Sequence, residues 1–169
     1  AADSVPALVA AGARAVVTGP NGIRELPVES VVTAPGKTSL DKAEIVEAIL
    51  LDKRLPNSRD AYLRFIPRTE MDIAVVGVAV NLMIDEDGLI SSARVVLGAV
   101  APTFIVVDNA AAALGGTKLD ETALSALASA CSAACQPIDD KRGTVDFRKQ
   151  VAGVLARRAA LNAFNRAGG

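Results

Sequence analysis

The sequence contains no histidine and no tryptophan, and aromatic residues make up only 3% of its 169 residues. Without histidine there is no imidazole to serve as an acid or base near neutral pH, and no Ser-His or Cys-His nucleophile pair. The two cysteines, Cys131 and Cys135, cannot supply the four thiolates of an iron–sulfur cluster, and without histidine a structural zinc site is not expected. We expect both cysteines to be buried, reduced and inert, because a regular helix does not offer disulfide geometry at i,i+4.

An excess of charge of one sign is also missing. The 18 basic and 19 acidic side chains leave a net charge of −1, which gives no electrostatic surface for nucleic acid or an anionic membrane. The longest apolar run, residues 73–84, is interrupted by Asn81 and is shorter than the roughly 20 residues of a spanning helix. No signal-peptide pattern opens the chain. We therefore predict a cytoplasmic protein with no nucleic-acid partner and no membrane-spanning segment.

Turn residues organise the first part of the chain as β structure. The residues Gly19-Pro20-Asn21-Gly22 separate two short apolar runs, which predicts a hairpin. Gly12 ends a short helix that Asp3 or Ser4 begins. The predicted elements of this part are a helix over 3–11, strands over 13–18, 23–28 and 44–51, and an extended segment over 60–65.

The second part begins with the clearest strand. The even positions of residues 73–84 are mostly large and apolar, whereas the odd positions include Gly77, Ala79 and Asn81. This alternation predicts one core face and one smooth face that another segment can approach closely. Further strands are predicted over 89–100 and 103–107, and helices over 109–114, from Asp120 to the turn before Pro137, and over 145–165.

These elements predict an α+β fold, in which a β-rich N-terminal piece precedes a three-stranded antiparallel sheet packed against helices. We place the domain boundary near Pro67, between residues 1–66 and 67–169. The last helix, with Thr144 as its N-cap, is predicted to bury an apolar stripe, and its basic residues, Arg148 among them, are expected to lie in solvent or to pair with acids. The stripe consists of Phe147, Val151, Val154, Leu155 and Leu161.

Four ordered motifs stand out from this framework. The first combines residues 3–10, which read Asp-Ser-Val-Pro-Ala-Leu-Val-Ala, with residues 35–38, which read Pro-Gly-Lys-Thr. Residues 62–73 read aromatic-x-cation-x-x-x-Arg-x-x-Met-Asp-Ile and run into the clearest strand. Residues 93–102 read Ala-Arg-x-x-x-Gly-x-x-Ala-Pro, and residues 137–148 read Pro-x-x-Asp-x-Arg-Gly-Thr-x-x-Phe-Arg. Taken singly, Arg64 is most simply a surface ion pair, Asp72 a turn cap or a partner of Arg68, and Val46 a core residue.

Together, the motifs resemble the C-terminal half of the flavin subunit of molybdenum hydroxylases, the family of xanthine dehydrogenase, aerobic carbon monoxide dehydrogenase and 4-hydroxybenzoyl-CoA reductase. The resemblance implies an FAD-containing subunit that relays electrons between iron–sulfur clusters and an external acceptor. It implies as partners the molybdenum-cofactor subunit and the iron–sulfur subunit of the same complex. It also implies cofactor contacts for Arg64, Val46, Asp72 and Ile73, with Arg64 at the pyrimidine edge of the flavin, where the family usually carries lysine.

The two glycine-rich segments that hold the FAD phosphates in this family have no counterpart here. The resemblance therefore predicts that the chain begins inside the flavin domain and that the fragment alone is inactive. An alternative is a cofactor-free α+β domain with a structural or subunit-interface role. An independent hydrolase is disfavoured because histidine is missing, although a Ser-Lys or carboxylate mechanism stays open.

Overall fold

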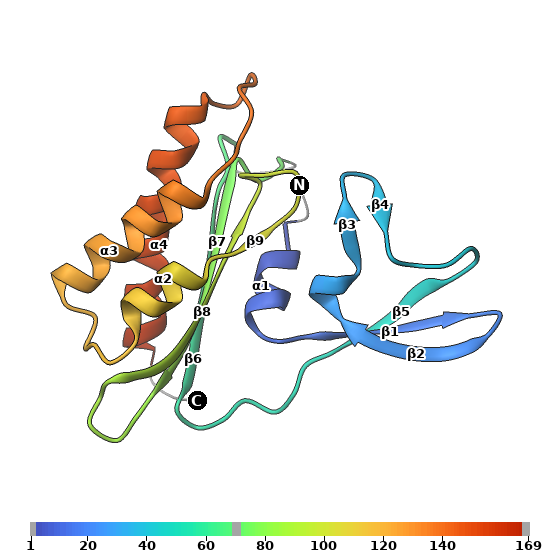
Figure 1. Ribbon diagram of the computed structural model, residues 1–169, viewed down its shortest axis with the longest axis horizontal. Coiled ribbons are helices and arrows are strands. Elements are labelled where there is room, and N and C mark those ends of the chain that lie inside the picture. Colours follow the sequence, from blue (N-terminus) through green and yellow to red (C-terminus); the bar gives the residue numbers. More distant parts are fainter. Residues whose placement is uncertain (1–2, 69–71, 167–169) are drawn as a thin grey trace.

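The computed structural model describes residues 3–68 and 72–166, so positions 69–71 of the motif at 62–73 lie outside the described residues. Figure 1 shows the arrangement of its elements. In chain order these are α1 (Val5–Ala10), β1 (Arg14–Gly19), β2 (Gly22–Pro27), the 3-10 turn η1 (Val28–Ser30), β3 (Val32–Ala34), β4 (Lys37–Thr38), β5 (Ile45–Leu50), β6 (Ser58–Phe65), β7 (Val76–Ile84), β8 (Ile90–Gly98), β9 (Ile105–Val106), α2 (Asp108–Leu114), α3 (Glu121–Ala134) and α4 (Val145–Asn165).

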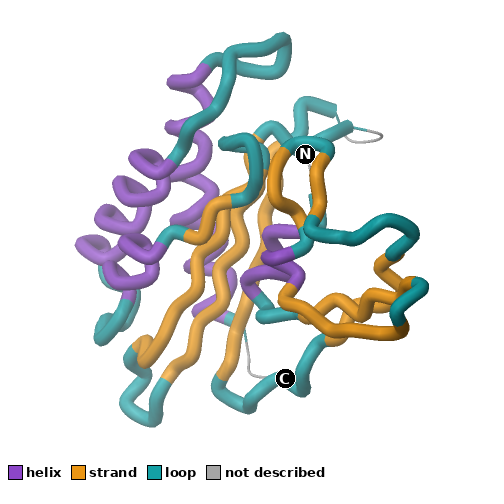
Figure 2. The backbone as a smooth tube through the Cα atoms, turned by 45° about the vertical axis from the view of Figure 1, so that its right-hand side comes forward, coloured by secondary structure: helices purple, strands orange, loops and turns teal. Residues whose placement is uncertain are grey.

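The largest sheet has the strand order β6-β7-β8-β9, and all its neighbours are antiparallel. Helices α2, α3 and α4 cover one face, and α1 lies on the other (Figures 1 and 2). The predicted α+β class is confirmed. The prediction of three strands is wrong, because β6, expected only to be extended, pairs with β7 from Ser58↔Met83 to Phe65↔Val76. The boundary between residues 66 and 67 stays a prediction.

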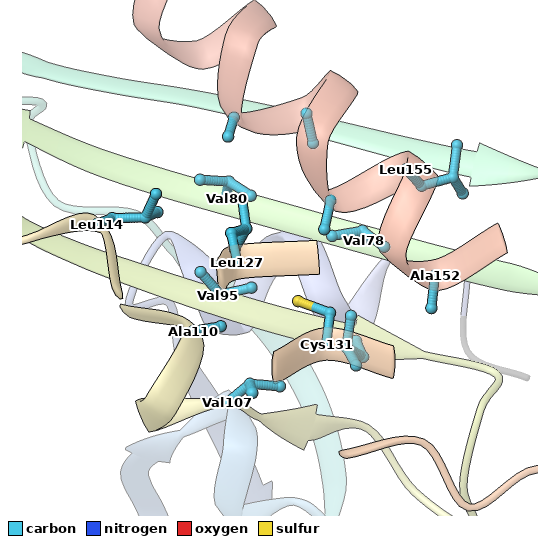
Figure 3. Close-up of a cluster of buried hydrophobic side chains, with 14 of the residues drawn as sticks. Val78, Val80, Val95, Val107, Ala110, Leu114, Leu127, Cys131, Ala152 and Leu155 are labelled. Atoms are coloured by element: carbon cyan, nitrogen blue, oxygen red, sulfur yellow. The ribbon is translucent and has the colours of Figure 1, made fainter. Parts of the chain in front are cut away.

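Strand β7 explains why the helices pack where they do. Its even-numbered residues Val76, Val78, Val80 and Leu82 are fully buried and belong to the main hydrophobic core. Leu127 and Cys131 of α3 and Leu155 of α4 belong to the same core (Figure 3). The strand therefore holds the helical layer through large aliphatic side chains, as the alternation in the sequence predicted.

The opposite face of the sheet is smooth, and α1 packs directly on it. A Cβ atom added to Gly98 would lie 2.5 Å from Cγ of Pro6, so the backbone of β8 and helix α1 approach too closely for a side chain. The Asn81 side-chain amide donates a hydrogen bond of 3.0 Å to the carbonyl of Ala10 at the end of α1. The predicted close approach is thus confirmed, and the approaching segment belongs to this chain.

A second, smaller sheet has the order β2-β1-β5. Ala15 and Val17 of β1 are buried in a second core that also contains Val9 of α1 and Ala79 of β7. Strand β5 is exposed along almost its whole length, and within the described residues it pairs with β1 alone. The N-terminal strands therefore attach to the large sheet through α1.

Both long helices begin where the sequence predicted. The side chain of Asp120 accepts a hydrogen bond from the N–H of Ala123 at 2.8 Å, and that of Thr144 accepts one from the N–H of Phe147 at 3.2 Å. Each bond satisfies one of the free amides of a first helical turn. Helix α4 spans Val145–Asn165, the range expected from its pattern.

The predicted buried face of α4 is wrong in part. Of the proposed stripe, Leu155 belongs to the core and Val151 packs against it, whereas Phe147, Val154 and Leu161 are 37%, 43% and 39% exposed. The buried face consists instead of Arg148, Ala152, Gly153, Leu155, Ala156, Ala159, Ala160 and Ala163. Small residues occupy this face because α4 lies close to α3. A Cβ added to Gly153 would be 2.8 Å from Oγ of Ser132.

The two cysteines are buried free thiols. The Sγ atom of Cys135 lies 3.1 Å from the carbonyl oxygen of Cys131, to which it donates. Burial raises the pKa of Cys131 to about 12 and that of Cys135 to about 11. Neither thiol is therefore a ready nucleophile at neutral pH.

Among the described helices, none is both long and apolar enough to cross a membrane.

The contact between Gly98 and Pro6 predicts the outcome of a substitution. Gly98→Ala should lower the free energy of unfolding by about 1–3 kcal/mol, because the rigid proline ring cannot yield to the added methyl group. Gly115→Ala is the matched control, since its nearest atom would be the carbonyl oxygen of Ala112 at 3.7 Å. This control should be neutral or slightly stabilising. Urea unfolding of the two variants checks the prediction, and equal effects would contradict it.

Candidate functional site

Arg64 lies near the end of β6, and its side chain is tied to the first residue that the structure describes. Its guanidinium forms an ion pair with one carboxylate oxygen of Asp3. The other oxygen of Asp3 accepts a hydrogen bond of 3.1 Å from the backbone N–H of Ala74. Asp3 therefore holds the cation of Arg64 beside the segment 72–74, although Asp3 is 61 positions away from Arg64 in the sequence.

Asp72 lies at the start of that segment and is almost enclosed, with a side chain 3% exposed. Its carboxylate accepts a hydrogen bond of 3.3 Å from Nε of Arg68, and Nε of Arg142 lies 3.7 Å away. The hydrogen bond from Arg68 is the main reason that the pKa of Asp72 lies below its ordinary value. The carboxylate of Asp72 thus pairs with two arginines. Its pairing with Arg68 is one of the alternatives that the sequence pattern left open.

A cleft of about 720 Å³ opens next to these charges. Ile73 lines it with a side chain 45% exposed, and the turn at Pro35 and Gly36 faces it from the N-terminal strands. Arg142 and Arg148 contribute the cationic part of its lining, and Asp140 contributes a carboxylate. The cleft therefore lies between the two parts of the chain and combines apolar walls with two guanidinium groups.

The structure brings three of the four predicted site residues together. Arg64 reaches the segment of Asp72 and Ile73 through Asp3. Val46 lies on β5 of the smaller sheet and does not line the cleft. The roles of all four in binding a cofactor stay predictions.

Two residues were missed as parts of the site. Asp3 was assigned to a helix cap and to the first motif, but nothing in the sequence places it beside a residue 61 positions away. Arg148 was expected in solvent or paired with an acid. It does pair with Asp140, but it is 4% exposed and lines the cleft. The motif at 137–148, in which it is the last residue, was the one signal that could have drawn attention to it.

A second groove, of about 780 Å³, lies on the α1 side of β8. Arg94 and Glu29 line it and form an ion pair with each other. It includes none of the predicted site residues, so the cleft beside Ile73 is the better candidate site.

Comparison with known proteins identifies the family. Residues 61–163 match the family model described as the CO dehydrogenase flavoprotein C-terminal domain. The chain is 33% identical over 159 residues to the carbon monoxide dehydrogenase medium chain of Hydrogenophaga pseudoflava, covering 94% of this chain and 54% of that one. It is 27% identical to the xanthine dehydrogenase FAD-binding subunit of Escherichia coli O157:H7, covering 99% of this chain and 58% of the relative.

Solved structures agree with this assignment. A chain of the reconstituted CO dehydrogenase from Oligotropha carboxidovorans superposes with a TM-score of 0.90 at 30% identity, covering 98% of this chain and 57% of that chain. The chain described here therefore belongs to the CO dehydrogenase flavoprotein family and corresponds to the C-terminal part of the FAD-binding subunit of molybdenum hydroxylases. It spans a little over half the length of the curated relatives it matches.

The lowered pKa of Asp72 predicts how stability depends on pH. A carboxyl group with a folded pKa below its unfolded value of about 3.9 stabilises the fold above that pH, and the contribution is lost as pH falls through the folded pKa. The unfolding free energy should therefore decrease from about pH 5 downward, and less steeply in Asp72→Asn. Denaturant unfolding at several pH values measures this. The exposed turn variant Asp87→Asn is the control, and a slope in Asp72→Asn equal to the wild type would refute the assignment.

Proposed function

We propose that this chain forms the wall beside the isoalloxazine of FAD in the flavin subunit of a molybdenum hydroxylase. In this role the complete subunit relays electrons between iron–sulfur clusters and an external acceptor. The observation that carries the proposal is the placement of Arg64, whose guanidinium is held by Asp3 next to the entrance segment of β7. The family membership supports FAD as the cofactor of the complete subunit.

The residues present fit the edge of a flavin ring. Arg64 offers a fixed cation whose side chain is part-exposed, so it can face a bound group. FAD, when bound, supplies the redox chemistry, and its reduced ring can carry a negative charge near N1 and O2. A cation at that edge favours the reduced form. Asp3 fixes the position of the cation and also offsets part of its charge, so the pair, and not Arg64 alone, sets the local field.

Ile73 and the cleft extend this wall. The cleft volume lies in the range of ligand pockets, and its apolar sides suit a planar ligand or ring edge. We assign the cleft as the side from which the external acceptor approaches, with the guanidinium of Arg142 near its rim. In the complete enzyme the partners would be the molybdenum-cofactor subunit and the iron–sulfur subunit. The cytoplasmic location stays a prediction.

A cofactor-free interface role is the second candidate, and one observation favours it. Val154 and Leu161 lie seven residues apart on α4, and each is more than a third exposed. A seven-residue spacing places them in one line along the helix, which suits packing against another protein. Neither residue lines the cleft, so this role and the flavin wall are compatible.

The proposal predicts the effect of removing the cation. In the FAD-loaded complete subunit, Arg64→Ala should lower the flavin reduction potential by about 30 mV, which corresponds to roughly 1.4 kcal/mol in a two-electron couple. Asp3→Asn should raise it, because the variant removes the opposing charge. Arg64→Lys should keep the reduction potential close to the wild-type value, since the positive charge matters more than the planar guanidinium. Potentiometric titration measures all three.

Arg157→Ala is the matched control for this experiment. Arg157 lies on α4 and pairs with Glu121 at 2.8 Å, away from the cleft. Its replacement should leave the potential unchanged. If Arg64→Ala and wild type have the same potential, Arg64 is only a surface ion pair and the flavin-wall proposal fails.

The chain alone should bind FAD weakly or not at all. Pyrophosphate binding needs rows of backbone N–H groups of the kind that glycine-rich segments provide, and the sequence pattern shows no such segment. Titration of FAD with the purified chain, followed by flavin fluorescence, tests this. Stoichiometric yellow protein would contradict the expectation, and a complete subunit that also lacks flavin would favour the interface role.

A further inference from the structure

Arg148 is a charged residue buried in the first turn of α4. It is 4% exposed, and its guanidinium contacts four residues from three separate stretches of chain. Nη2 donates to Oδ1 of Asp140 at 2.6 Å, Nη1 donates to the carbonyl of Val75 at 2.8 Å and to that of Ala99 at 3.3 Å, and Nε donates to the carbonyl of Gly143 at 3.5 Å. The planar fork of arginine suits such divergent acceptors, which a lysine ammonium cannot reach together.

Two of these contacts fasten the ends of neighbouring strands. Val75 directly precedes β7 and follows the site segment 72–74, and its N–H donates to the carbonyl of Phe65 at 2.9 Å. Ala99 directly follows β8 and has a φ of +65°, a conformation that non-glycine residues rarely adopt. Since a strained residue persists only where its surroundings hold it, the bond from Arg148 to Ala99 is part of what fixes this wall of the cleft.

The contact with Asp140 reaches the site from a second direction. Oδ1 of Asp140 also accepts the backbone N–H of Arg142 at 2.8 Å. The side chain of Arg142 in turn lies beside the carboxylate of Asp72. A continuous series of polar contacts thus runs from Arg148 through Asp140 and Arg142 to Asp72, and it meets the direct bond to Val75 at the same segment.

We propose that Arg148, paired with Asp140, is a positioning residue that sets the place of Asp72 and Ile73 against the flavin edge and the cleft. The effect on the flavin rests on the proposed function. The positioning of Asp72 and Ile73 rests only on the contacts of Arg148. Arg148 contacts strand ends and a loop, not the reacting ring. It acts by holding residues 72–75, which lead into β7, from two sides.

The geometric part is tested on the chain itself by amide hydrogen exchange. Arg148→Lys keeps the positive charge but loses the planar guanidinium that reaches several acceptors. Asp140→Asn keeps the shape of the side chain but replaces the carboxylate by a weaker, neutral acceptor. In both variants the amides of Ala74 and Val75, which donate to Asp3 and to the carbonyl of Phe65, should exchange about tenfold faster or more, as expected for losing a hydrogen bond to a charged group. The amides of Leu127 and Cys131 in α3 should keep their wild-type rates.

Arg157→Lys is the control, because it changes an ion-paired arginine of the same helix away from the cleft. It should leave the exchange of Ala74 and Val75 unchanged. Faster exchange spread evenly over the whole chain in Arg148→Lys would overturn the inference, since it would mean that Arg148 supports only general stability. Unchanged exchange at Ala74 and Val75 would overturn it as well.

The functional part is tested on the FAD-loaded complete subunit. Arg148→Lys leaves the net charge unaltered. A shift of the flavin reduction potential beyond that of Arg157→Lys would therefore mean that Asp72 and Ile73 have moved relative to the flavin, and it would support the inference. If Arg64→Ala shifts the potential and Arg148→Lys does not, the positioning role is overturned while the proposed function stands. If neither variant shifts it, the proposed function fails, and the exchange pattern alone decides whether Arg148 positions the segment.

Discussion

Strand β7 is covered on both faces by parts of the same chain, and each face places a different demand on its residues. The helical side requires Val76, Val78, Val80 and Leu82, whose area removed from water drives the packing of α3 and α4. The α1 side requires the small Ala79, which packs in the second core with Val9, and Gly77, where an added Cβ would lie 2.8 Å from the hydroxyl of Tyr62. The candidate site depends on both demands, since the segment that carries Asp72 and Ile73 enters the sheet where β7 begins.

Around that entrance, arginines and carboxylates are paired, some between near neighbours in the sequence and others over long sequence distances. Asp3 joins Arg64, Asp72 lies between Arg68 and Arg142, and Asp140 joins Arg148. Exposed pairs of this kind contribute little to stability, but the guanidinium of Arg148 is enclosed and would be costly without its acceptors. The pairs therefore matter most for geometry, because each one fixes a loop relative to a strand.

The sequence predicted the features that local chemistry controls. The alternation in β7, the hairpin at residues 19–22 and the caps Asp120 and Thr144 all depend on near neighbours, and all are found. The membership of β6 in the large sheet, the buried face of α4 and the pairing of Asp3 with Arg64 depend on tertiary contacts. Hydrophobic periodicity pointed to the larger side chains of α4, whereas close packing against α3 selected alanine and glycine. The motif resemblance supplied Arg64, Asp72 and Ile73 as neighbours, but not the residues that hold them.

Strand β5 has a consequence for the behaviour of the chain in solution. Its six residues, Ile45–Leu50, carry one charge, at Glu47, and no proline or glycine, and in the described part of the chain one of their edges is unpaired. Such an edge is a template for intermolecular strand addition, the first step of ordered aggregation. Charged residues flank it on both sides, Lys42 and Glu44 before it and Asp52, Lys53 and Arg54 after it, and act as gatekeepers. The colloidal stability of the chain at high concentration then depends on these few charges, and high salt, which screens them, should favour self-association.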